Sequence, residues 1–67
     1  MGTIFWKSLA EYERDLKSAS ADRVLEMRDW AAAGEAAADR PGLGRNPKAR
    51  RMFRQMRVAA EARLAGE

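Results

Sequence analysis

Apolar residues recur along the chain at the spacing of amphipathic helices. Three sets repeat at intervals of three or four residues: Leu9, Tyr12, Leu16 and Ala19; Val24, Met27, Ala31, Gly34 and Ala38; and Ala49, Met52, Phe53, Met56 and Ala60. This spacing puts the members of each set on one face of a helix. Beyond residues 3–6, no segment has the pattern of a strand. The pattern therefore predicts an all-α protein.

Serine residues mark where the first two helices begin. Ser8 and Glu11 have the spacing of a capping box, in which the two side chains satisfy free backbone N–H groups at a helix start. Thr3 offers a competing, earlier start. Ser20 can cap a second helix, because the Ser–Ala–Ser stretch that it ends weakens the first one. If this stretch is only a kink, the first two helices merge into one.

A connection rich in glycine and proline, residues 41–46, precedes the last helix. No helix continues through such a segment. Asn46 and Pro47 form a strong helix start, because the asparagine oxygen can accept from a free N–H and proline loses no bond at the first helical position. Gly66 fits the end. The predicted helices cover about 4–18, 20–39 and 47–65, in one domain of residues 1–67 that is a small three-helix bundle or, with the first two merged, a helical hairpin.

Gly34 lies on the apolar face of the second predicted helix. Glycine costs up to about 1 kcal/mol relative to alanine inside a helix. A residue this small either permits the close approach of another helix or marks the point where the helix ends in an alanine-rich tail. The sequence leaves both interpretations open.

The predicted core contains few large apolar side chains. Of the 67 residues 46% are apolar, but 14 of these are alanine and only 17 are larger apolar residues. A chain of this size often completes its core by oligomerisation or on the surface of a partner. We therefore expect a homodimer, with a well-packed monomer as the alternative.

Charge is unevenly distributed along the chain, although the net charge is only +3. Residues 1–34 carry five basic and six acidic side chains, whereas residues 40–57 carry seven basic side chains and no acidic one. The seven are Arg40, Arg45, Lys48, Arg50, Arg51, Arg54 and Arg57. At about 100° per residue, Arg50, Arg54 and Arg57 share the face of the last helix that lies opposite its apolar face.

The placement of these cations at a helix start indicates an anion-binding site. A helix N-terminus is the positive end of the helix dipole, where further cations are disfavoured unless an anion is bound. Arginine also suits the bidentate recognition of phosphate or carboxylate. We predict that the helix contacts the nucleic-acid backbone without reading sequence. The predicted contact residues are Arg45, Lys48, Arg50, Arg51, Arg54 and Arg57. The alternative is that these side chains form a solvated basic face that binds no ligand.

A second hypothesis is a regulator or inhibitor that binds a protein, of the kind with which phages and plasmids block a host complex. Tryptophan, tyrosine and arginine dominate the energetics of protein interfaces. The candidate anchors are Phe5, Trp6, Tyr12 and Trp30, with the arginine set facing an acidic protein surface. These aromatic residues also have a purely structural interpretation, in which they close a small core.

We do not expect an enzyme. The chain has no histidine and no cysteine, and its serines lie where helix caps belong. Without imidazole or thiolate, no metal and no cofactor is predicted. The longest apolar runs are three residues, so neither a membrane-spanning helix nor a signal-peptide core is predicted, and we expect a cytoplasmic protein.

Overall fold

Each helix begins at a polar side chain that accepts a hydrogen bond from the first turn. The computed structural model describes residues 6–39 and 46–66. Its helices are α1 (Leu9–Ser18), α2 (Ala21–Ala38) and α3 (Pro47–Ala65). The distances from cap oxygen to backbone nitrogen are 3.2 Å for Ser8–Glu11, 3.3 Å for Ser20–Arg23 and 3.1 Å for Asn46–Ala49. All three caps are among the helix starts that the sequence offers, and the all-α prediction is confirmed.

The first helix is shorter than predicted. It begins at Leu9 and not near residue 4, because Ser8 is extended (φ −148°, ψ 162°) and caps the helix. The Glu11 carboxylate accepts from the backbone N–H of Lys7 at 3.0 Å, so it satisfies a donor just outside the helix. The serine cap thus prevails over the earlier start at Thr3, a residue outside the described part of the chain.

Helices α1 and α2 are separate, so the merged hairpin is wrong. Ala19 has the extended conformation (φ −77°, ψ 143°), and Ser20 then caps α2. The guanidinium of Arg63, on α3, donates to the backbone carbonyl oxygens of Leu16 and Ala19. Because the last carbonyls of a helix have no partner within it, Arg63 both caps α1 and fastens it to α3.

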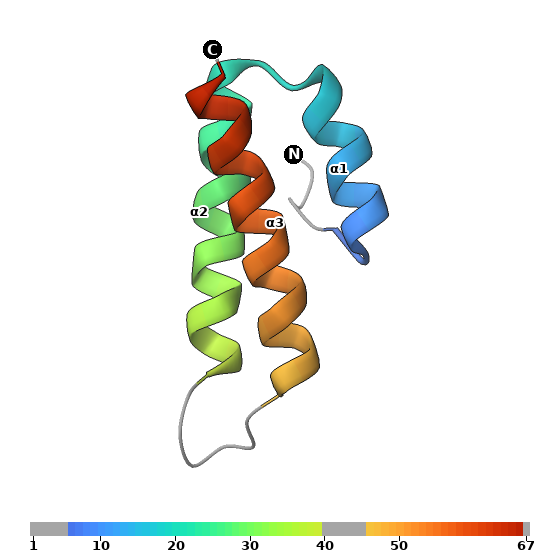
Figure 1. Cartoon of the computed structure of the whole chain (residues 1–67), viewed down its shortest axis with the longest axis vertical. Helices are drawn as coiled ribbons and strands as arrows, with labels where there is room; N and C mark the ends of the chain where they lie inside the picture. Colours follow the sequence, from blue (N-terminus) through green and yellow to red (C-terminus); the bar gives the residue numbers. More distant parts are fainter. Residues whose placement is uncertain (1–5, 40–45, 67) are drawn as a thin grey trace, which may run out of the picture.

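The helices form a bundle built on a hairpin (Figure 1). α2 and α3 run antiparallel side by side, and α1 packs chiefly against α3. The backbone N–H of Asn46 donates to the carbonyl oxygen of Ala38 at 3.2 Å, which joins the end of α2 to the start of α3. The chain is described as one copy, so the dimer stays a prediction.

Four aromatic rings form a chain of contacts that links the three helices of the bundle. Trp6, just before α1, meets Tyr12 and Trp30 edge-on, with centroids 5.2 and 4.9 Å away. Its indole N–H donates to Asp15 at 2.7 Å. Trp30 on α2 in turn meets Phe53 on α3 at 5.3 Å. Trp6 and Tyr12 are buried, and the other buried side chains of the core are Leu16, Val24, Met27, Ala31, Met56 and Ala60.

Gly34 permits the close approach of α2 and α3. A Cβ atom at this position would lie 2.5 Å from two ring carbons of Phe53, well inside van der Waals contact. The Phe53 ring therefore packs directly over the glycine backbone. This decides between the two interpretations of Gly34, because α2 continues past it to Ala38.

Candidate functional site

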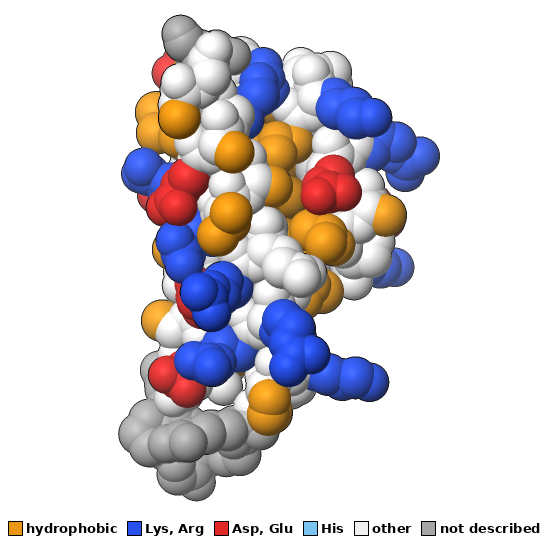
Figure 2. All heavy atoms as spheres, in the orientation of Figure 1, with side chains coloured by type: hydrophobic (Ala, Val, Ile, Leu, Met, Phe, Trp, Pro, Cys, Tyr) orange, Lys and Arg blue, Asp and Glu red, His pale blue; other side chains and the backbone are white. Residues whose placement is uncertain are grey.

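Four exposed cations lie along the first turns of α3, and we call them the basic α3 surface. They are Lys48, Arg50, Arg51 and Arg54. The Asn46 cap and Pro47 fix the start of the helix from which these side chains project. In Figure 2 blue side chains gather over the lower half of α3, where the helix begins. The structure thus brings together four of the six predicted contact residues.

The basic α3 surface surrounds a shallow hollow at the helix start. Its lining residues are Pro47, Arg50, Arg51 and Arg54. Among the described residues Arg50 forms one ion pair, with its nitrogen 3.9 Å from an oxygen of Asp39 and both side chains half exposed. An exposed pair at this distance is weak and screened by salt. Arg51 and Arg54 form no ion pair with any residue in the described ranges, so the hollow keeps a positive potential.

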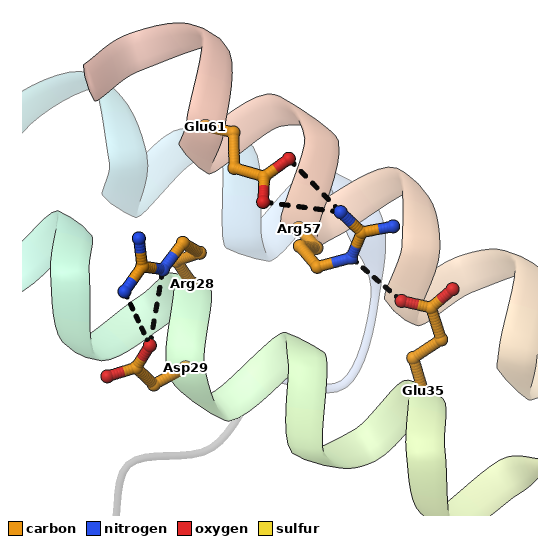
Figure 3. Close-up of polar contacts among 5 residues, drawn as sticks. All are labelled: Arg28, Asp29, Glu35, Arg57 and Glu61. Carbon is orange, nitrogen blue, oxygen red and sulfur yellow. Dashed lines mark hydrogen bonds and ion pairs between the residues drawn. The ribbon is translucent and has the colours of Figure 1, made fainter. Parts of the chain in front are cut away.

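Arg57 does not belong to this surface, although the sequence placed it there. Its Nε donates to Glu35 on α2 at 2.8 Å, and its Nη1 donates to both oxygens of Glu61 at 3.1 and 3.2 Å (Figure 3). The side chain is only 28% exposed. Arg57 therefore joins α2 to α3 and is already paired with two carboxylates, which makes it a poorer candidate for a phosphate contact than the exposed cations.

The charges of Arg57 and Glu35 stabilise each other. The hydrogen bond from Arg57 holds the pKa of Glu35 below its usual value of 4.5. Burial opposes this as the second-largest influence, and the positive charges of Arg57, Arg54 and Arg50 lower the pKa further. The hydrogen bonds to Glu35 and Glu61 raise the pKa of Arg57. Glu35 is therefore ionised near neutral pH, and its pKa depends in part on the positive charges of Arg50 and Arg54 in the basic α3 surface.

The aromatic residues proposed as interface anchors lie mostly inside the molecule. Trp6 and Tyr12 are buried, and Trp30 is half-buried between Trp6 and Phe53. These three rings close the core, so neither Trp6 nor Tyr12 is presented to a partner in this structure. The remaining anchor, Phe5, lies outside the described residues.

Some of the acidic residues that pair with these arginines were not identified from the sequence. Only one of them has a recognisable signal in the sequence. Glu61 follows Arg57 by four residues, which is a recognisable ion-pair spacing on a helix. Glu35 lies on α2 and Asp39 directly follows it, and nothing local indicates that they reach α3. Arg45, the remaining predicted contact residue, lies outside the part of the chain that the structure describes.

No other kind of site is evident in residues 6–39 and 46–66. Within these ranges no three His, Cys, Asp or Glu side chains gather as a metal site would require. None of the described helices combines the length and the apolar character needed to cross a membrane. Comparison with protein-family models, curated proteins and solved structures finds no significant match to this chain.

Proposed function

We propose that this protein binds the phosphate backbone of nucleic acid through the basic α3 surface. The observation that carries the proposal is the hollow lined by Arg50, Arg51 and Arg54 at a helix start. Guanidinium forks there complement an anion, and the helix dipole adds to the attraction. The proposed role is that of a small accessory or regulatory factor without catalytic activity.

The length of the basic α3 surface suits a run of phosphates better than a single anion. Lys48 and Arg54 are six residues apart, which is about 9 Å along a helix. One strand of a duplex carries two to three phosphates over about that length, at roughly 3.4 Å of axis for each. Both strands together present about five phosphates over that length, at roughly 1.7 Å of axis for each, so four cations can neutralise three to four of them.

The proposed binding is independent of base sequence. The side chain of Asn46 is engaged with the Ala49 N–H, so it is not free to read an adenine edge. Arginine and lysine contacts to phosphate fix position without carrying sequence information. Affinity should therefore depend strongly on salt and only weakly on the sequence of the nucleic acid.

Fluorescence anisotropy with a labelled random-sequence duplex and a labelled single strand tests the proposal. With three to four phosphate contacts, we expect duplex affinity to fall roughly 40- to 150-fold between about 50 and 200 mM salt. Arg51→Glu combined with Arg54→Glu should abolish the binding at both salt concentrations.

The matched control is Lys7→Glu with Arg14→Glu, which makes the same change in net charge at exposed positions near the start of α1. This control should retain most of the affinity at 50 mM salt. Equal loss in both double variants would show that net charge alone matters and would contradict the assigned surface. Absence of binding by the unaltered protein at 50 mM salt would overturn the proposal and leave the arginines to an acidic protein.

A further inference from the structure

An apolar groove runs between α1 and α3 and overlaps the basic α3 surface, because Arg51 and Arg54 also line it. Two adjoining hollows form it, with Glu13 and Ala59 common to both. The lining side chains that are apolar are Leu16 from α1 and Val58, Ala59 and Ala62 from α3. Val58 is 50% exposed, more than any other large apolar residue in the described ranges. We call this feature the α1/α3 groove.

We infer that the α1/α3 groove receives α3 of a second copy of this chain, in an antiparallel arrangement with the two-fold axis passing near Val58. The inference concerns free protein and does not rest on nucleic-acid binding. A two-fold interface is self-complementary, so the same strip of α3 must supply both sides. The charges along α3 meet this condition.

The outer face of α3 changes character along its length. Its first half carries the four cations of the basic α3 surface, whereas Val58, Ala62 and Ala65 follow at the outer positions of its second half. Antiparallel docking places the basic half of each copy against the half of the other that carries these apolar residues and Glu61. The two Arg51 residues would then lie about 20 Å apart along the axis, since each is seven residues from Val58. Screening at physiological salt, with a Debye length of about 8 Å, removes most repulsion at that separation.

One pair of opposite charges also matches across the proposed interface. Arg54 lies four residues before Val58, and Glu61 lies three residues after it, on the same edge of the outer face. Antiparallel pairing about Val58 therefore brings Arg54 of one copy beside Glu61 of the other, and the symmetry does so twice. Glu61 keeps 47% of its side chain exposed while bonded to Arg57, so it can accept a second partner.

The need for such an interface follows from the small core. The buried side chains of the described residues comprise six large ones and two alanines. Domains of this size commonly add apolar burial by oligomerisation. Helix α3 of a second copy would cover Val58 and the exposed parts of Leu16, Ala59 and Ala62, which extends the existing packing between α1 and α3.

Analytical ultracentrifugation of the free protein between about 10 μM and 1 mM tests the inference. We expect a concentration-dependent monomer–dimer equilibrium. Val58→Lys puts two ammonium groups against each other at the axis, so the dimer dissociation constant should rise at least about 100-fold. Leu25→Lys is the matched control, because Leu25 is the other exposed large apolar residue, at 39%, and lies on α2. It should dimerise like the unaltered protein.

A cross-linking experiment identifies the face independently of stability. The chain has no cysteine, so Val58→Cys introduces a single thiol. A short thiol-specific bifunctional reagent should then yield covalent dimer from Val58→Cys and little from Leu25→Cys. Equal yields from both variants, or a protein that stays monomeric at about 1 mM, would overturn the inference. Because no nucleic acid is present, such a failure leaves the proposed function untouched.

Discussion

The Tyr12 side chain combines favourable packing with an unsatisfied polar group. Its ring packs against Trp6 and Trp30, and it is fully buried. Its hydroxyl group has no hydrogen-bond partner in the described part of the chain. Trp6 differs, since its N–H donates to Asp15. Burial disfavours the charged phenolate and raises the pKa of Tyr12 to about 12.

Tyr12→Phe should stabilise the protein by about 1 kcal/mol, because it removes a buried hydroxyl whose desolvation is not compensated. The gain should grow at alkaline pH. Tyrosine ionises near pH 10 in the unfolded chain and only near 12 in the folded one, so the native protein loses stability as the pH rises from 10 to 12. Urea unfolding at about pH 7 and pH 11 measures both effects. A less stable Phe variant at neutral pH would mean that the hydroxyl does have a partner.

At the scale of elements, the helices owe their boundaries to local chemistry and their packing to side chains distant in sequence. The caps at Ser8 and Ser20 act within three residues. The contact of Gly34 with Phe53 joins residues that are 19 positions apart on α2 and α3. Arg63 reaches still further to the carbonyls at the end of α1. Packing therefore opposes what helix propensity alone predicts at Gly34.

Gly34→Ala should destabilise the protein by about 1 kcal/mol. Alanine gains about 1 kcal/mol of helix propensity, but forcing the Phe53 ring aside costs typically 1–3 kcal/mol. Thermal unfolding measures the net effect. Ala33→Gly, at an exposed position of the same helix, gives the propensity effect alone. In the background Phe53→Leu, with its smaller side chain, Gly34→Ala should become neutral or stabilising, and purely additive effects would contradict the clash.

For the whole molecule, the bond from Arg57 to Glu35 connects the two long helices. Because the pKa of Glu35 is lower in the folded protein than its ordinary 4.5, its contribution to stability is present above that value. The contribution is lost as the pH falls through the folded pKa. The same ion pair keeps Arg57 from the basic α3 surface.

We predict that Glu35→Gln lowers stability at neutral pH and flattens its decline between about pH 5 and pH 2. Urea unfolding across this range compares the variant with the unaltered protein. Glu26→Gln is the control, since Glu26 belongs to an exposed pair with Arg23 within one helix, at 3.6 Å. It should follow the unaltered protein closely. A decline in Glu35→Gln as steep as that of the unaltered protein would show that this carboxylate does not govern acid unfolding.

The sequence by itself determined the helices and the cluster of cations at the start of α3. Caps, breakers and apolar spacing act over a few residues, so their effect is visible locally. Lys48, Arg50, Arg51 and Arg54 are exposed together because they lie near one another on one helix opposite its apolar face.

Only the tertiary structure decided which of the candidate side chains remain available to bind a partner. It removed Arg57 from the cationic set by placing Glu35 beside it, and it turned Trp6 inward onto Tyr12. Both outcomes depend on how helices pack, which joins residues distant in sequence through burial and charge. Sequence periodicity gives the apolar face of each helix, but it does not give the neighbour that this face or its edges will meet.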